Sequence, residues 1–231
     1  MSKDIAATSR PHLGLLCNSD VPEAIAADFE RGVSAEGLDL VIERRSSPQI
    51  YAGVEWLMPT AIIAYVAKSY FDGFLKEMGK EHYLSLKAAL KSLAVRLSKV
   101  KTTRTATPGK ISGDQEYSMV FSICFDRNPS GSFKFLMPVT LSEEEFDAAM
   151  VSLFAFMEAY LSETQEVSDK TAVLDVLSSA RPYGGTVLLA YNPATHGIEA
   201  IDPLAKIRPA HDSPRRAGTE IEEKPSAGGG G

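Results

Sequence analysis

The stretch Tyr51–Val100 dictates more of the fold than any other part of the sequence, because a short buried run leads there into a long helix. The run Ala61–Val66 is continuously apolar and contains β-branched and aromatic residues, which is typical of a strand covered on both faces. A buried helix is the alternative, but Pro59 fits badly inside a helix because it removes a backbone hydrogen bond. We therefore expect a strand, followed by a helix that Ser69 and Asp72 start with a capping box.

The helix that follows Gly79 carries a narrow apolar stripe, because apolar residues recur there at spacings of three and four. The stripe consists of Tyr83, Leu86, Leu90, Leu93 and Leu97. Such a stripe predicts a helix packed on a sheet. The alternative is an interface with a second copy of the chain or with another protein, which would make this helix the interaction surface.

Charge is distributed unevenly along the chain. The net charge of −6 disfavours a nucleic-acid binder, since phosphate binding needs an electropositive surface. Basic residues nevertheless gather in and just after the same helix, and this basic patch comprises Lys80, Lys87, Lys91, Arg96, Lys99, Lys101 and Arg104. The patch is either a solvated helix face followed by an exposed loop or a binding surface for an anionic partner.

The residues before this stretch have the pattern of a βαβ unit. His12–Cys17 and Leu38–Glu43 are apolar runs of strand length. Between them, Asp20 and Pro22 open a helix, and Gly37 ends that segment. A strand, a helix and a strand in about thirty residues predict parallel pairing of the two strands.

A polar loop at 101–114 joins two halves of the chain, 12–100 and 115–202. Just after the loop, large apolar side chains alternate with smaller or polar ones on both sides of a Pro- and Gly-containing turn. This alternation predicts a β-hairpin over residues 117–137.

The remaining elements follow from local signals. Ser142 and Glu145 form a capping box that predicts the start of a long amphipathic helix. A short helix is expected at 169–178, and Thr186–Tyr191 with Ile198–Ile201 predict a last hairpin.

These elements together predict an α/β (or α+β) fold, in which a βαβ-type parallel sheet with helices precedes antiparallel hairpins and a long amphipathic helix. We expect a disordered lead-in at 1–11, a single domain at 12–202 and a flexible tail at 203–231 that ends in glycines. With 44% hydrophobic residues, no apolar run long enough to span a membrane and no secretory signal, the chain is expected to be cytoplasmic.

The sequence contains few residues in a catalytic arrangement. Its four histidines lie far apart and lack metal-ligand spacing beside Cys, Asp or Glu, so we expect no metal site. Cys17 and Cys124 lie in predicted strands and are expected to be buried free thiols. These observations favour a non-enzymatic interaction module without a cofactor, which self-associates or docks a protein partner through residues 80–100.

The order of elements over residues 13–77 resembles the front half of a Toll/interleukin-1 receptor (TIR) domain. The similarity lies in a strand ending in small polar residues (LGLLCNSD), a helix, a strand (LDLVIE), and a buried strand leading into a helix (IIAYVAKSYFDGFLKE). In catalytic members of that family, a Glu early on this helix serves the cleavage of NAD. The resemblance implies an NAD glycohydrolase as the enzymatic alternative, with Glu77 as the matching residue and Glu81 as the fallback. A carboxylate there would stabilise the cationic sugar that forms as nicotinamide leaves.

Two further alternatives concern the surface and the end of the chain. The apolar run and the basic residues between 80 and 110 could bind an anionic membrane surface peripherally. The glycines at 228–231 resemble the tails that ubiquitin-like proteins present for conjugation.

Overall fold

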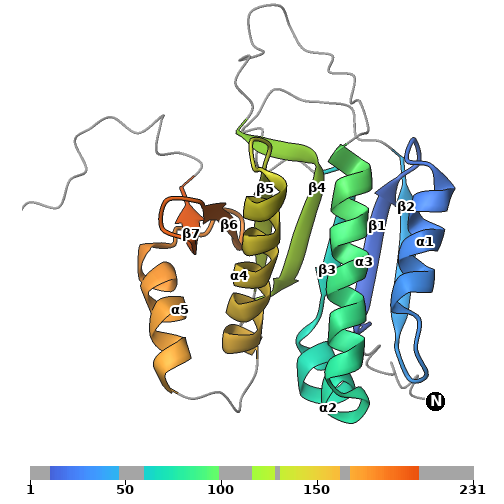
Figure 1. Cartoon of the computed structure of the whole chain (residues 1–231), viewed down its shortest axis with the longest axis horizontal. Helices are drawn as coiled ribbons and strands as arrows, with labels where there is room; N and C mark the ends of the chain where they lie inside the picture. The colour runs from blue at the N-terminus through green and yellow to red at the C-terminus, as the bar shows by residue number, and fades with distance from the viewer. Residues whose placement is uncertain (1–10, 47–59, 99–115, 128–130, 162–166, 203–231) are drawn as a thin grey trace, which may run out of the picture.

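The described strands form one seven-stranded mixed sheet in the order β2-β1-β3-β4-β5-β6-β7 (Figure 1). The computed structural model describes residues 11–46, 60–98, 116–127, 131–161 and 167–202. The strands are β1 (Leu13–Asn18), β2 (Leu40–Arg45), β3 (Ile62–Val66), β4 (Tyr117–Asp126), β5 (Ser132–Pro138), β6 (Thr186–Asn192) and β7 (Gly197–Ile201). The helices are α1 (Glu23–Val33), α2 (Leu75–Met78), α3 (Lys80–Ser98), α4 (Glu143–Leu161) and α5 (Val167–Ser179), with a π-helical segment, η2 (Tyr70–Phe74), before α2. Residues 1–10 of the predicted lead-in, the whole of the predicted loop at 101–114 and the predicted tail at 203–231 lie outside the described residues.

The pairing of the strands confirms the predicted α/β class. β1 and β2 are parallel and α1 connects them, which is the predicted βαβ unit. The β4–β5 and β6–β7 pairs are the two predicted antiparallel hairpins. β3 runs antiparallel to β1 and parallel to β4, so parallel pairing among the first three strands is confined to β1 and β2.

The start of the helix after β3 corrects one local prediction. The strand itself is present at Ile62–Val66, but helical structure begins at Lys68, so Ser69 lies inside the first turn. Ser69 has helical backbone angles and makes no side-chain capping hydrogen bond, and Asp72 instead forms an ion pair of 2.7 Å with Lys68. The predicted capping box is therefore wrong, because the helix starts before the residue that was to cap it.

Gly79 separates α2 from α3, as the sequence predicts. Its φ of 75° is a left-handed value that residues with a side chain rarely adopt. The capping box at the start of α4 is also confirmed: the Ser142 amide donates to Glu145 Oε2 at 2.8 Å, and the Glu145 amide donates to Ser142 Oγ at 3.2 Å.

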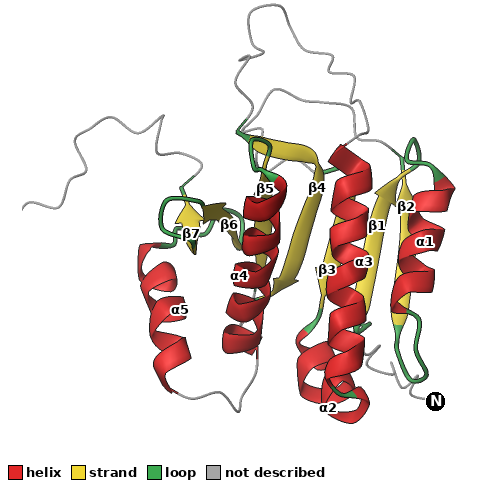
Figure 2. Cartoon of the chain, in the orientation of Figure 1, coloured by secondary structure: helices red, strands yellow, loops and turns green. Residues whose placement is uncertain are grey.

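The helices α1, α3 and α4 lie side by side in front of the sheet, with α3 in the middle (Figure 2). Between the two layers lies one continuous hydrophobic core. Alternate residues of β1 and β3 enter it, and Phe125 and Phe133 stack within it at 4.9 Å between ring centroids. Because α3 contacts both α1 and α4, the residues on its two sides join the three helices into one layer.

Candidate functional site

The apolar stripe of α3 lies in the core of the chain itself. Leu86, Leu90, Leu93 and Leu97 are buried, and Tyr83 is half-buried against the same cluster. The stripe therefore packs α3 onto the sheet, as the first interpretation of the pattern predicts. It does not present an exposed seam, so a partner that binds α3 must contact a different part of its surface.

The basic patch is likewise used in part within the chain. Lys91 forms an ion pair of 2.5 Å with Asp147 of α4, and Arg96 forms one with Asp28 of α1. Lys87 Nζ lies 4.4 Å from the centre of the Tyr83 ring on the same helix and 5.2 Å from that of the Phe154 ring on α4, so it makes a cation–π contact between the two helices. These three cations therefore hold the helical layer together, while Lys80 is exposed and Lys99, Lys101 and Arg104 lie outside the described residues.

A groove of about 450 Å³ separates α1 from α3. Its lining consists of Ile25, Asp28, Phe29, Arg31, Gly32, Ser85, Ala88, Ala89, Ser92, Leu93 and Arg96. Five of these eleven residues are small (Gly32, Ser85, Ala88, Ala89 and Ser92), and the charged ones are an aspartate and two arginines. The α3 contribution combines the exposed residues Ser85, Ala88, Ser92 and Arg96 with the buried residues Ala89 and Leu93, and Leu93 belongs to the stripe.

Gly32 and Ala89 bring the two helices close together at the groove. A Cβ atom added to Gly32 would lie 3.2 Å from the Cβ of Ala89, which is tighter than ordinary side-chain contacts. Small residues at a helix–helix contact let the backbones approach, and small residues beside the contact leave space between the helices. The groove is this unfilled space.

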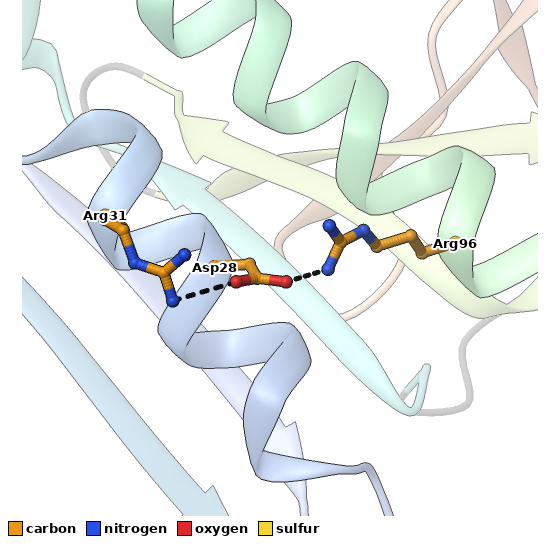
Figure 3. A network of polar contacts seen from close by, with 3 residues as sticks. All are labelled: Asp28, Arg31 and Arg96. Carbon is orange, nitrogen blue, oxygen red and sulfur yellow. Dashed lines mark hydrogen bonds and ion pairs between the residues drawn. The ribbon is translucent and has the colours of Figure 1, made fainter.

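Two arginines converge on one carboxylate in the groove (Figure 3). Arg31 Nη2 lies 3.0 Å from Asp28 Oδ1 on the same helix, and Arg96 of α3 reaches the other carboxylate oxygen. The hydrogen bond from Arg96, together with the positive charges of both arginines, holds the pKa of Asp28 below its usual range. The arrangement therefore contains an ionised carboxylate and one excess positive charge.

The junction of α1 with α3 is also fastened by a buried polar contact away from the arginines. His82 Nε2 donates to the Val33 carbonyl at 2.7 Å, since a carbonyl can only accept. The Tyr70 hydroxyl lies 2.9 Å from His82 Nδ1, and burial raises the pKa of Tyr70. This contact joins η2, α3 and the end of α1, so it fixes the position of α1 without filling the groove.

The carboxylates implied by the TIR resemblance lie elsewhere. Glu77 is exposed on α2 and Glu81 is exposed in the first turn of α3, and neither lines the groove. Their assignment, and NAD as a substrate, stay predictions. In the described part of the chain, no three His, Cys, Asp or Glu residues come together as a set that could hold a metal ion.

Cys17 and Cys124 lie within the sheet and away from the groove. Both are free thiols within strands, as predicted, but only Cys17 is fully buried, while the Cys124 residue is half-buried. Burial raises the pKa of the Cys124 thiol to about 11, so this thiol is almost entirely protonated at neutral pH. Nearby, Thr60 and Ser122 share a hydrogen bond of 2.7 Å that joins β4 to the residues before β3.

Sequence reasoning missed Asp28, Arg31 and Gly32, although a signal for them was present. Asp28 and Arg31 are three residues apart, which places them on one helix face. On α3, the small residues Ser85, Ala88 and Ser92 recur at spacings of three and four, beside the leucine stripe. A second stripe of small residues on one helix indicates an accessible face. The leucine stripe alone does not reveal this face.

Comparison with known proteins adds no family assignment. None of the described helices is both long enough and apolar enough to cross a membrane. No family model matches the chain, and neither curated proteins nor solved structures give a significant match.

Proposed function

We propose that this chain is a non-enzymatic interaction module that docks a protein partner in the α1/α3 groove. The observation that carries the proposal is the groove itself, which has about 450 Å³ of space between two helices and small side chains along its walls. Binding grooves between helices commonly accept a segment of a partner protein.

The chemistry of the lining supports binding rather than catalysis. Its one carboxylate, Asp28, is ionised and engaged by two arginines, and the lining residues include no histidine. The serines Ser85 and Ser92 therefore have no base beside them in the groove that could activate them as nucleophiles. The same groups are well suited to orient a bound segment through hydrogen bonds.

In this proposal, residues 80–100 remain the docking element, but the small residues of α3 form the binding surface in place of the leucine stripe. The leucine stripe anchors α3 to the sheet, which holds the small residues of α3 at a fixed distance from α1. A surface that is already rigid loses little conformational entropy when a partner binds, and this favours affinity.

The test compares partner capture by three forms of the full chain. Ala88 is exposed and lines the groove, so Ala88→Trp fills the space without changing charge or disturbing the core. Val151→Trp places the same side chain on an exposed position of α4, where Val151 is 61% exposed, and serves as the matched control. We expect the wild type and Val151→Trp to capture the same protein and Ala88→Trp to capture at least about tenfold less.

Light scattering on the purified chain accompanies the capture experiment, because a second copy is the alternative partner. A dimer that Ala88→Trp dissociates would show self-association through the groove. Equal capture by Ala88→Trp and the wild type would reject the groove as the docking surface. A strictly monomeric chain that captures no partner would reject the interaction module.

A further inference from the structure

We infer that the segment bound in the groove is an acidic helix of a partner protein, whose carboxylates take over arginine donors now shared on Asp28. The inference rests on the proposed function and specifies the chemistry of the partner.

The charge of the groove motivates an acidic ligand. Arg31 and Arg96 face each other across the groove, one from each wall, and share the single carboxylate of Asp28 (Figure 3). One positive charge is therefore not neutralised within the lining. The Arg31 side chain is 76% exposed, so much of its five-donor guanidinium faces solvent.

The arginines can exchange partners easily. Ion pairs between exposed groups are weak, because solvent and salt screen them and both side chains lose freedom when they pair. A carboxylate from a partner can bind one guanidinium through two parallel hydrogen bonds, while Asp28 keeps the other. The bound state then has two carboxylates for two guanidiniums, and the charge of the groove is balanced.

The walls of the groove favour a helical ligand over an extended one. Both walls are helices whose backbone amides and carbonyls are already bonded within the helix, so they offer no ladder to a strand. A helix satisfies its own backbone groups and needs only side-chain contacts. From Ser85 to Arg96 the α3 wall extends over roughly 16 Å, which is about three turns of a ligand helix.

The small residues determine how closely that helix can approach. Gly32, Ser85, Ala88 and Ser92 present little side-chain volume, so a partner helix can lie over the groove and insert the small or medium apolar side chains of one face between α1 and α3. Asp or Glu residues at the edge of that face, spaced by three or four, would then reach Arg31 and Arg96.

The experiment uses two synthetic peptides of about four helical turns with the same apolar face. One carries Glu at the edge positions and the other carries Gln there. Binding to the full chain is measured by fluorescence anisotropy. We expect the Glu peptide to bind about tenfold tighter than the Gln peptide, since hydrogen bonds to charged groups contribute more than those between neutral groups.

Three substitutions in the groove should change the binding of the Glu peptide in different directions. Arg96→Gln should abolish the preference for Glu over Gln, and Arg31→Gln should reduce it. Asp28→Asn should increase the affinity for the Glu peptide, because it removes the carboxylate that competes for both arginines. Lys91→Gln is the matched control, since it removes one positive charge from α3 at an ion pair outside the groove lining and should leave the preference unchanged.

The outcomes separate this inference from the function on which it rests. If both peptides bind equally and Ala88→Trp blocks both, the groove is a docking surface but the acidic partner is wrong. If Lys91→Gln weakens the Glu peptide as much as Arg96→Gln does, the attraction is general charge and the inference fails. Failure of both peptides to bind also overturns it, whereas capture of a partner that Ala88→Trp prevents would still support the module.

Discussion

The two sides of α3 are joined to their neighbours by similar ion pairs but by very different packing. Arg96 pairs with Asp28 on the α1 side, and Lys91 pairs with Asp147 on the α4 side. On the α4 side, the rings of Tyr83 and Phe154 meet edge to face at 5.3 Å. On the α1 side, small residues leave the groove. The comparison indicates that side-chain volume, and not the ion pairs, decides which junction stays open.

The largest predicted effect is at the filled junction. Phe154 is fully buried and contacts both Tyr83 and Lys87, so Phe154→Ala should lower the free energy of unfolding by about 3–5 kcal/mol. Urea denaturation measures this change. Val151→Ala on the exposed side of α4 should change it by no more than about 0.5 kcal/mol. A loss below about 1 kcal/mol for Phe154→Ala would mean that this junction is not tightly packed.

Two tyrosine-to-phenylalanine substitutions, at Tyr70 beside α3 and at Tyr83 within α3, should affect the stability of the chain differently. The Tyr70 hydroxyl contacts buried His82, so Tyr70→Phe leaves a ring nitrogen without its partner and should lower the free energy of unfolding by about 1–3 kcal/mol. The Tyr83 hydroxyl is buried and has no hydrogen-bond partner among the described residues. Tyr83→Phe should therefore leave the stability unchanged or raise it.

Denaturation midpoints of the two variants measure the difference. Equal losses would contradict the role of the Tyr70–His82 contact, because both substitutions remove one hydroxyl from a largely buried ring. A larger loss for Tyr83→Phe would reverse the comparison between the two junctions, since it would give the α4 side the stronger polar contact.

The smallest predicted effect is the pH dependence of the Asp28 contact. The pKa of Asp28 is lower in the folded chain than in the unfolded chain, so its contribution to stability is present above the unfolded pKa of about 3.9. It is lost as the pH falls through the folded pKa. The difference in stability between the wild type and Asp28→Asn should therefore be largest near neutral pH and vanish in acid.

Denaturation of both forms at a series of pH values checks this expectation. Added salt should also reduce the difference at neutral pH, because both arginines are exposed to solvent and Asp28 is partly exposed. A difference that stays constant from neutral pH to strong acid would show that the ionisation of Asp28 contributes nothing to the stability of the folded chain.

Local signals predicted elements of the fold more reliably than they predicted relations between elements. Pro59 correctly indicated a strand at Ile62–Val66, and the Ser142–Glu145 pair correctly indicated the start of α4. The antiparallel direction of β3 against β1 could not be predicted, because it depends on pairing between residues about fifty positions apart that no short pattern encodes.

The groove as a whole was beyond prediction for the same reason, although the small residues of α3 were a signal for one of its walls. It forms only when α1 and α3 lie together, and its charges come from Asp28 and Arg96, which are far apart in sequence. Arg96 was part of the predicted basic patch, but a charge pattern does not reveal that Asp28 of the same chain lies opposite it. The leucine stripe was predictable because helix periodicity alone determines which side chains share a face.

The order of the strands has a consequence for how the chain folds. Apart from the β1–β3 pair, every pairing in the sheet joins strands that are consecutive in the sequence. Only the β1–β2, β4–β5 and β6–β7 pairs span short connections, whereas Ile62 of β3 pairs with Phe121 of β4 and Ser132 of β5 pairs with Thr186 of β6 across long ones. Pairs that close short loops form faster than pairs that must first bring distant segments together. We therefore expect these three short-range pairs to form early, and the β1–β3, β3–β4 and β5–β6 pairings to be the slower steps that unite them into one sheet.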